Sequence, residues 1–600
     1  MYRPEHPKPQ FFRPKWLNLN GMWDFSFDFG DSGKEKNWEF QKPENTQKIN
    51  VPFCIESKLS GVEHKDFVNA IWYFKSFELP KNWETNRTFI HFGAIDYEAH
   101  IYINGHFAGK HIGGGVSFAF EITEFLNQEE NKIAVYVKDL TKANVQPLGK
   151  QSAKLDSYSC LYTRTTGIWQ TVWLESRGNS FIEEVKITPD VDNSSFLFLP
   201  KFQNIDTDMI FEVKILDNSE QVCSKSQIAS NGVAIKIEIP NPKLWSPETP
   251  FLYDIEYTLK KKTGISQDET EFFDNKDRAF QGENETILDR ISSYAGLRKI
   301  HIEDNKFYLN NQEIFLRFVL DQGFYPDGIW TAPSDEALKN DILLSINAGF
   351  NGARLHQKIF EERFLYWADK LGYLVWAEYY DWGINYNSYE SFYNHTKEWI
   401  EEIERDYNRP SIIGWTPFNE TLSGAMANRE LHDIHVKDII DITHTLDKTR
   451  PINDCSGYTH VETDIYTVHD YDQNWESFKE RYSDVSPDNF KSYEPGDIEK
   501  IPYKGQPFVI DEYGGTWWSL HEENEEDWGY GQKPKSITEV YERIKNLTKS
   551  IIDNPNIAGF CYTQLTDVEL EKNGIYTYNR EEKFDMSKIK SYFSQKRQKI

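Results

Sequence analysis

Cysteine is scarce in this chain. Only five occur among 600 residues, and none stands in a Cys-x-x-Cys pair. This composition argues against a cysteine-based zinc site or a disulfide framework. We expect reduced thiols that are mostly buried, as is usual in reducing compartments. The five positions are Cys54, Cys160, Cys223, Cys455 and Cys561.

Long apolar runs and an excess of positive charge are also missing. No segment approaches the roughly 20 apolar residues of a membrane span. The opening stretch, MYRPEHPKPQFF, has no apolar core of a signal peptide. The formal net charge is −28, whereas nucleic acids and anionic membranes are bound by basic surfaces. These absences predict a cytoplasmic protein with no nucleic-acid partner and no membrane partner.

Aromatic residues, by contrast, are abundant. Phe, Trp and Tyr make up 15% of the chain, and such rings stabilise large β cores or stack on flat apolar faces of ligands, sugars included. The length of 600 residues exceeds what one hydrophobic core supports, so we expect three or four domains.

The first half of the chain has the pattern of antiparallel β structure. In residues 1–180, short aromatic and β-branched runs such as WDFSFDF and RTFIHFGA are punctuated by Gly, Asn, Asp and Pro. Asn104-Gly105 separates two apolar arms and predicts a type I′ hairpin turn. We predict a jelly-roll β-sandwich here. Residues 181–298 predict a second, immunoglobulin-like β-sandwich that lacks a Cys…Trp…Cys core.

From residue 299 to 600 the pattern changes to strand, loop and helix. Two expected helices stop at glycines, Gly349 and Gly372. Eight strands that alternate with helices over about 300 residues predict a (β/α)8 (TIM) barrel. The candidate strands are 315–320, 352–356, 374–379, 412–418, 452–456, 465–469, 508–513 and 560–565.

Two carboxylates follow barrel strands with similar framing. Glu420 ends the apolar run SIIGWTPFNE, and Glu512 ends QPFVIDE. Barrel chemistry belongs at the C-terminal ends of strands, so the closed barrel brings the two together. Two facing carboxylates suit glycoside hydrolysis, with retention at a separation of about 5–5.5 Å and inversion at roughly 6.5–9.5 Å. The alternative is that each is a solvated strand end, and alternation turns either Asp511 or Glu512 outward.

The same motifs resemble glycoside hydrolase family 2, which contains β-galactosidases, β-glucuronidases and β-mannosidases. WTPFNE and VIDEYGG resemble its acid/base and nucleophile signatures. This sequence has WTPF before Asn-Glu, whereas the commoner form has Gly directly before Asn-Glu. LNLNGMWDFSFD, TGIWQTVWLES and KLWSPETPFLY resemble its two sandwich domains. The resemblance implies a retaining mechanism with Glu420 as acid/base, Glu512 as nucleophile and Asn419 bonded to the sugar 2-OH. We expect partial desolvation to raise the pKa of Glu420.

Further candidates for sugar binding lie at the other strand ends and in the loop after Glu512. That loop contains several Trp residues suited to stacking on sugar rings, and Tyr513 is a candidate to hold the nucleophile in place. No metal site is predicted, although some family members bind Mg²⁺ or Na⁺ near the site. The candidates are Asp321, Arg354, His356, Glu378, His469, Tyr471, Tyr513, Trp517, Trp528 and Gln564.

The resemblance implies a β-galactosidase-like exo-glycosidase that removes terminal non-reducing sugars from small glycosides or oligosaccharides. The loop after Glu512 has no Asn-x-Lys, the motif with which β-glucuronidases of the family hold the substrate carboxylate. The absence of this motif makes β-glucuronidase specificity less favoured. Lys358 or Arg354 could bind an acidic sugar another way. β-Glucuronidase, β-galacturonidase and β-mannosidase specificities stay open. So do transglycosylation and a non-catalytic carbohydrate-binding role, and a homodimer is a candidate assembly.

Overall fold

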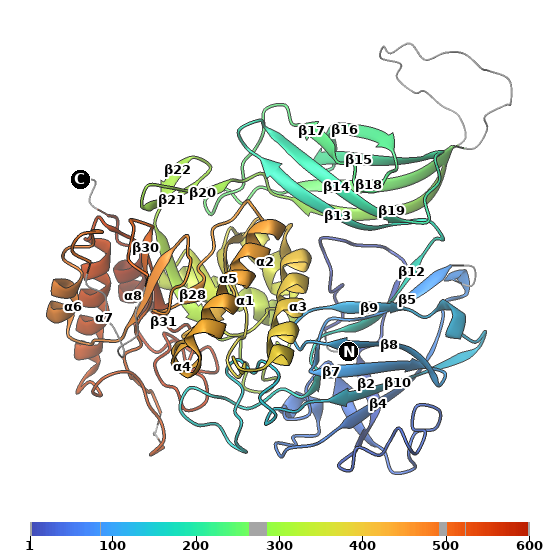
Figure 1. The fold of residues 1–600 in the computed structure, drawn as a ribbon, viewed down its shortest axis with the longest axis horizontal. Helices are drawn as coiled ribbons and strands as arrows, with labels where there is room; N and C mark the ends of the chain where they lie inside the picture. Colours follow the sequence, from blue (N-terminus) through green and yellow to red (C-terminus); the bar gives the residue numbers. More distant parts are fainter. Residues whose placement is uncertain (1–2, 84–85, 263–284, 491–500, 522–523, 598–600) are drawn as a thin grey trace.

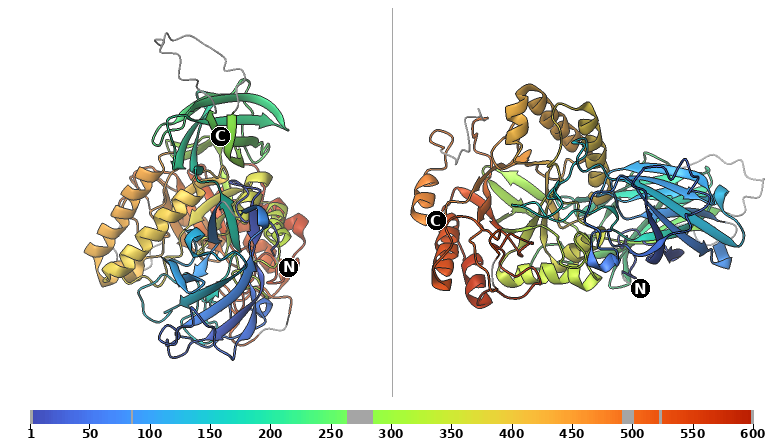
Figure 2. Two further views of the ribbon diagram at one scale, coloured as in Figure 1. Left: turned by 90° about the vertical axis from the view of Figure 1, so that its right-hand side faces the viewer. Right: turned by 90° about the horizontal axis from the view of Figure 1, so that it is seen from below.

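The computed structural model describes residues 3–83, 86–262, 285–490, 501–521 and 524–597. It contains three units in chain order, two β-sandwiches followed by a (β/α)8 barrel, and this confirms the predicted fold class. Figure 1 shows both sandwiches beside the barrel, and Figure 2 shows the same arrangement in two further views. Within the described ranges, every helix is too short or too polar to span a lipid bilayer. All five cysteines are free.

The first sandwich packs a six-stranded antiparallel sheet against a four-stranded one around a core of aliphatic and aromatic side chains. Asn104 and Gly105 join β7 to β8 with φ of 52° and 83°, as the predicted type I′ turn requires. The strands of this unit are β1 Trp16–Asn18, β2 Gly21–Phe27, β3 Gln47–Val51, β4 Ile71–Glu78, β5 Arg87–Phe92, β6 Ile95–Asp96, β7 Glu98–Ile103, β8 His106–Ile112, β9 Phe118–Glu121, β10 Glu130–Lys138, β11 Gly167–Ile168 and β12 Val172–Arg177.

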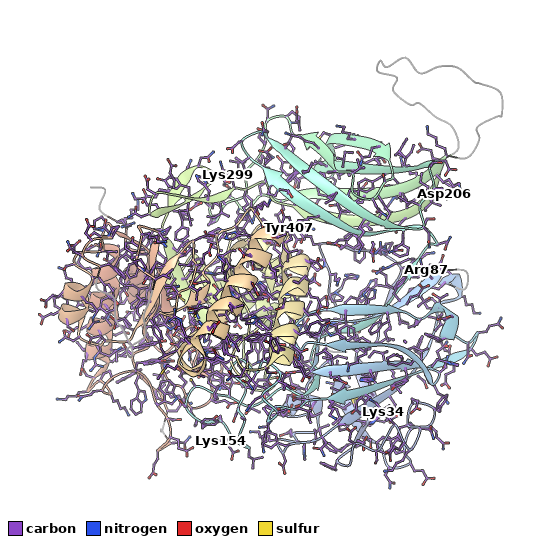
Figure 3. All side chains as sticks on the ribbon, viewed as in Figure 1. Lys34, Arg87, Lys154, Asp206, Lys299 and Tyr407 are labelled. Atoms are coloured by element: carbon purple, nitrogen blue, oxygen red, sulfur yellow. The ribbon has the colours of Figure 1, made fainter. Side chains whose placement is uncertain are left out.

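The second sandwich consists of a three-stranded and a four-stranded antiparallel sheet. In β15, MIFEVKILD, alternate side chains are buried because successive residues of a strand point to opposite faces. Its surface meets the barrel at Tyr407, which is labelled in Figure 3 and whose ring lies 3.8 Å from Lys186 Nζ. The strands are β13 Phe181–Asp190, β14 Ser195–Gln203, β15 Met209–Asp217, β16 Glu220–Ile228, β17 Ile235–Glu238, β18 Tyr253–Lys262 and β19 Glu285–Ala295.

A small sheet precedes the barrel, whose strands are all parallel. Seven strands form one ladder in the order β26-β25-β24-β23-β31-β30-β29, and β27 pairs with β28 to supply the remaining position. The strands are β20 Ile300–Glu303, β21 Lys306–Leu309 and β22 Gln312–Ile314 of the small sheet, and β23 Leu316–Asp321, β24 Gly352–Leu355, β25 Leu374–Glu378, β26 Ile412–Thr416, β27 Phe418–Asn419, β28 Cys455–Ser456, β29 Tyr466–Asp470, β30 Phe508–Gly514 and β31 Ile557–Thr563 of the barrel.

Helices cover the outside of the barrel, and their ends follow local sequence signals. The Ser334 side chain caps α1 by accepting a hydrogen bond from Ala337 N. Both α1 and α2 end at glycines with positive φ, 103° at Gly349 and 71° at Gly372, as predicted. The helices are α1 Asp335–Ala348, α2 Glu362–Leu371, α3 Tyr389–Asp406, α4 Leu422–Ala427, α5 Arg429–Leu446, α6 Trp475–Arg481, α7 Ile537–Ile552 and α8 Met586–Phe593.

Residues 139–166, between β10 and β11, leave the first sandwich and lie against the barrel; we call them the bridging segment. Figure 3 labels Lys154 of this segment beside the barrel. Leu148 N and Gly149 N donate to Trp382 O at 2.6 and 3.1 Å. Gly149 has a φ of 58°, and a Cβ there would lie 2.4 Å from Gln357 O. A residue with a Cβ would clash there, so this close approach of the segment to the barrel requires glycine.

Candidate active site

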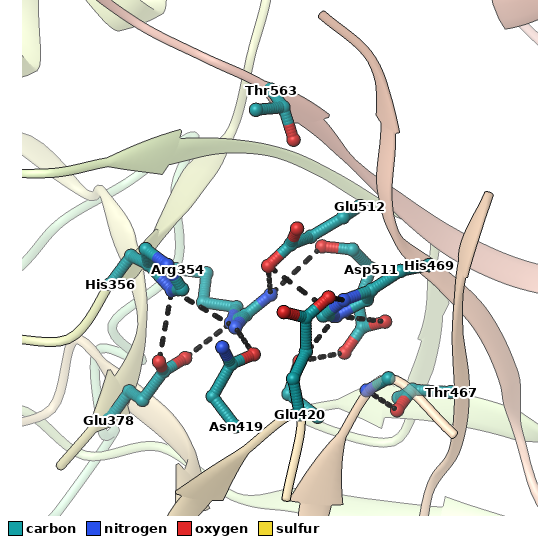
Figure 4. Close-up of polar contacts among 12 residues, drawn as sticks. Arg354, His356, Glu378, Asn419, Glu420, Thr467, His469, Asp511, Glu512 and Thr563 are labelled. Carbon is teal, nitrogen blue, oxygen red and sulfur yellow. Dashed lines mark hydrogen bonds and ion pairs between the residues drawn. The ribbon is translucent and has the colours of Figure 1, made fainter. Parts of the chain in front are cut away.

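The barrel brings the two candidate acids together at the C-terminal ends of its strands. Glu420 directly follows β27, and Glu512 lies in β30. One carboxylate oxygen of each and a ring nitrogen of His469 lie within 4.8 Å of one another. Figure 4 shows the two carboxyl groups turned toward each other, with Arg354 on one side and His469 on the other. The fold therefore brings together two side chains that are 92 positions apart in the sequence.

Glu420 is held in a specific environment. Its backbone has a φ of 49°, a left-handed conformation that is uncommon for residues with a Cβ and is often found at functional sites. Its Oε1 lies 2.6 Å from His469 Nδ1 and accepts a hydrogen bond from the Tyr458 hydroxyl at 3.1 Å. Its side chain is 24% exposed, which leaves it accessible from the barrel mouth.

The pKa of Glu420 differs from our expectation. Burial alone would raise it, but the charge of His469 and its hydrogen bond outweigh burial and lower the pKa to about 2. The predicted rise is therefore wrong for the free protein. The reason is a neighbouring cation from β29 that no pattern around residue 420 reveals.

Glu512 has the surroundings of an ionised carboxylate. Its oxygens accept hydrogen bonds from Arg354 Nη1 at 2.9 Å and from the Tyr471 hydroxyl. Burial would raise the pKa of Glu512, yet His469 and Arg354 together lower it. A carboxylate that stays charged near neutral pH is suited to nucleophilic attack.

Arg354 organises one side of this site and is fully buried. Its guanidinium donates to Glu378, to Asn419 Oδ1 at 2.7 Å and to Glu512. Glu378 also lies 3.0 Å from His356 Nδ1. Removing one partner of such a buried network leaves another charge uncompensated, so these groups hold each other in place.

Asn419 has one half of its amide bonded and the other half without a partner among the described residues. Its Oδ1 is occupied by Arg354, whereas its buried Nδ2 donates to no described residue. A buried amide nitrogen of this kind calls for an acceptor such as a sugar hydroxyl. His356 is similar, because its Nδ1 faces Glu378 while its Nε2 bonds to no residue within the described ranges.

Tyr471 lies between Glu512 and the loop that follows it. Its ring stacks on Tyr530 with centroids 3.4 Å apart, and the edge of Trp528 meets Tyr530 at 5.2 Å. Trp528 thus lies behind the tyrosine pair. Trp517 packs on Gly529 and Lys533 of its own loop, away from any described contact with the two acids. Two acids of this loop, Glu522 and Glu523, lie outside the described residues.

Replacing Tyr471 with Phe tests the hydrogen bond to Glu512. Losing a donor to the charged form should raise the pKa of Glu512, because hydrogen bonds to a carboxylate favour ionisation. We expect the acidic limb of the kcat/KM profile to move to higher pH, with kcat/KM reduced about 10-fold at its maximum. An acidic limb that stays in place would contradict this role for Tyr471.

Two further predictions about individual residues are wrong. Tyr513 faces away from Glu512, and its hydroxyl bonds Thr548 of α7 at 2.8 Å. Asp511 and Glu512 are both buried toward the barrel interior, because a β-bulge interrupts the alternation of β30. Gln564 is fully buried and bonds Gln322 and Asn573, and its contact with a sugar stays a prediction.

Asp321 is another predicted sugar-binding residue. Asp321 accepts from Gly323 N at 2.9 Å, and burial together with Asp341 raises its pKa to about 6.

In the described part of the chain, one group has the spacing of metal ligands, namely Glu420, His469 and Glu512. These three already satisfy each other by ion pairs and a 2.6 Å hydrogen bond, so we assign no metal to them.

The bridging segment brings a charged residue to the site that the sequence did not indicate. Lys150 is 6% exposed, and its ammonium lies 3.8 Å from the ring centroid of Trp382. Burial would lower the pKa of Lys150, but Cys160, Glu512, Glu571 and Glu420 raise it. A lysine in a loop of another domain carries no sequence signal of such a role. Its side chain is therefore a charged group that the first sandwich adds to the barrel site.

Other proteins share this architecture. The sugar binding domain model of glycosyl hydrolases family 2 matches residues 17–175, the general family 2 model matches residues 180–273, and the family 2 TIM barrel domain model matches residues 300–597. The β-glucuronidase from Ruminococcus gnavus in complex with D-glucuronic acid has a similar fold, with a TM-score of 0.78 and 18% identity over 99% of this chain and 100% of that one.

Two relatives illustrate the range of names among similar sequences. A β-galactosidase of Thermoanaerobacter pseudethanolicus is 27% identical over 78% of this chain and 58% of its own length. A β-glucuronidase of Paenibacillus borealis is 22% identical over 72% of each protein. The first match thus spans little more than half of that relative. Together, the three matching models and the barrel with its paired acids place this chain in glycosyl hydrolases family 2.

Proposed function

We propose that the protein is a retaining exo-β-glycosidase that works by double displacement. The observation that carries this proposal is the proximity of the two acids, since one oxygen of Glu420 and one of Glu512 lie within 4.8 Å of each other. Retaining glycosidases need a short separation of about 5–5.5 Å, because the nucleophile attacks the sugar directly, with no water between them. The ionised state of Glu512 fits that role.

The proposed reaction has two steps. Glu512 attacks the anomeric carbon while Glu420 passes a proton to the leaving oxygen, and a glycosyl-enzyme forms. Water then attacks the same carbon, Glu420 takes its proton, and Glu512 is released. Asn419 Nδ2 and Arg354 support this chemistry, the first as a donor to the sugar and the second as a fixed charge beside Glu512.

Action on terminal sugars is supported by how the mouth of the barrel is closed on one side. Trp528 Nε1 donates to Ser159 O of the bridging segment at 2.9 Å, which joins the loop after β30 to the first sandwich. Tyr162 of the same segment donates to Glu571 at 2.5 Å. A site walled by these contacts accepts a chain end more readily than the middle of a polysaccharide.

The retaining mechanism can be tested with a panel of nitrophenyl β-glycosides that includes galactoside, glucuronide, galacturonide and mannoside. We expect turnover on at least one, with the β-anomer of the free sugar appearing first in proton NMR spectra. Initial formation of the α-anomer would overturn the retaining proposal. Sugar binding without any turnover would instead indicate a carbohydrate-binding protein.

The identity of the sugar is the more specific part of the proposal. A β-galactosidase-like activity agrees with the name of one relative. An acidic sugar is the second candidate, and Lys150 favours it. Its ammonium lies 3.8 Å from the centroid of the Trp382 ring and donates to no described residue, so it is available to an acceptor on a ligand. A substrate carboxylate would supply that acceptor.

Replacing Lys150 with Met tests the acidic-sugar candidate while keeping most of the side-chain length. If a carboxylate binds there, kcat/KM on the glucuronide or galacturonide should fall about 10- to 100-fold, the size of a hydrogen bond to a charged group. The galactoside should change less than about 3-fold. Lys154→Met is the matched control, because Lys154 lies in the same segment but is exposed. Equal losses on acidic and neutral glycosides would exclude the carboxylate.

A further inference from the structure

His469 lies among three carboxylates. Its Nδ1 is 2.6 Å from Glu420 Oε1, and its Nε2 is 3.4 Å from both Asp511 Oδ1 and Glu512 Oε1. The ring is 2% exposed. It is thus the group that joins the proposed acid/base to the proposed nucleophile (Figure 4).

The hydrogen bonds fix which ring nitrogen exchanges a proton. Ser456 Oγ donates its single hydrogen to Asp511 Oδ2 at 2.6 Å and lies 2.9 Å from His469 Nε2. Since a hydroxyl has one hydrogen, Oγ must accept from Nε2, and Nε2 therefore carries a proton. The remaining nitrogen, Nδ1, shares one proton with Glu420 Oε1.

The surroundings decide where that shared proton lies. Burial would lower the pKa of His469, but Glu512, Asp511 and Glu420 raise it. The Tyr458 hydroxyl donates to the same Oε1 of Glu420, which favours a carboxylate there. The titratable and charged groups around the ring and its partners are Glu420, Tyr458, Asp511, Glu512, Arg354, His356 and Lys150.

We propose that His469 is a positioning residue that stores the proton for the acid step, so that the free enzyme holds an imidazolium–carboxylate pair and Glu420 acts as the carrier between this store and the leaving oxygen. This inference rests on the proposed retaining mechanism. Histidine is suited to such storage because its ordinary pKa lies close to neutral pH.

The proton and charge balance closes over the first step. Glu420 takes the proton from Nδ1 on Oε1, and its carboxyl turns about the last side-chain torsion, which has broad minima, to face the leaving oxygen. Glu512 forms a bond to the anomeric carbon as the bond to the leaving oxygen breaks, and that oxygen takes the proton. Imidazolium plus two carboxylates become imidazole, one carboxylate and one neutral ester. The net charge is one negative before and after.

The same balance explains why the store releases its proton at the right moment. Among the carboxylates that raise the pKa of His469, Glu512 has the largest effect, and its charge disappears when the ester forms. When water cleaves the ester, that charge returns, and the proton taken by Glu420 can go back to Nδ1. The charge of Glu512 thus controls whether His469 carries the stored proton.

Nuclear magnetic resonance of protein labelled with ¹⁵N-histidine tests this directly. The His469 ring signals are assigned by their loss in His469→Gln. We expect imidazolium shifts in the wild type at pH 7 and a neutral ring with a proton on Nε2 in Glu512→Gln, with the pKa of His469 at least one unit lower. Glu571→Gln is the matched control, because this buried carboxylate makes no described ion pair with His469, and it should leave the ring charged.

Two results would overturn the proposal. One is a neutral ring in the wild type at pH 7, and the other is an equally charged ring in Glu512→Gln. This measurement needs no turnover, so its failure is distinct from a failure of the glycoside panel. A kinetic readout complements it. The alkaline limb of kcat/KM in the wild type should coincide with the His469 titration, and a limb that does not follow it would contradict proton storage.

Discussion

The substitution Glu512→Gln should abolish turnover while leaving sugar binding intact. The amide keeps the shape of the Glu512 side chain but cannot form the glycosyl ester, so kcat is expected to fall by about 10⁴- to 10⁶-fold, the range seen when a nucleophile is removed. Binding should survive, since Arg354, Asn419 and His356 are unchanged. The measurement is kcat on the best glycoside of the panel, beside the Kd of a non-hydrolysed analogue.

The loss must be separated from misfolding. Arg354 donates to Glu512 and Glu378, so the variant keeps one carboxylate partner for the guanidinium, and the carbonyl oxygen of the new amide still accepts. An unchanged Tm and unchanged ligand affinity would show that the site is intact. Rates within about 10-fold of the wild type would refute Glu512 as the nucleophile.

Glu420→Gln should show a loss that depends on the leaving group. General acid catalysis contributes about 10²- to 10⁴-fold, and it matters most where the leaving oxygen is basic. We expect a loss of that size on phenyl glycosides and a much smaller one for glycosyl-enzyme formation from dinitrophenyl glycosides, which leave without a proton. The measurement is kcat/KM across a series of aryl glycosides.

Azide provides the second half of that test. It attacks the glycosyl-enzyme without needing a base, so it should partly restore kcat on activated substrates and yield a β-glycosyl azide. Uniform losses across all leaving groups, with no rescue by azide, would argue against the acid/base role. The variant also frees His469 Nδ1 from its carboxylate partner, so its ring titration should shift as well.

The sequence predicted those parts of the molecule that local patterns determine. Alternating apolar residues marked the strands, and Gly349 and Gly372 marked the ends of two helices, because these signals act within a few residues. The positions of Glu420 and Glu512 followed from the rule that barrel sites lie at the C-terminal ends of strands. Such rules place backbone segments well.

The parts that failed depend on contacts between distant segments. The low pKa of Glu420 comes from His469 on another strand. Asp511 and Glu512 both face inward because of a bulge in β30, and a bulge depends on neighbouring strands as well as on the strand itself. Lys150 arrives from the first sandwich, and no spacing rule links it to a barrel strand.

The bridging segment brings part of the first sandwich to the site in the barrel. A barrel expressed without it would lack Lys150 and the wall formed by Tyr162 and Ser159. A hybrid that joined this barrel to the sandwich of a relative would import another side chain at that place. If Lys150 binds the sugar as proposed, exchange of the first sandwich would change the sugar preference of this protein with every barrel residue left untouched.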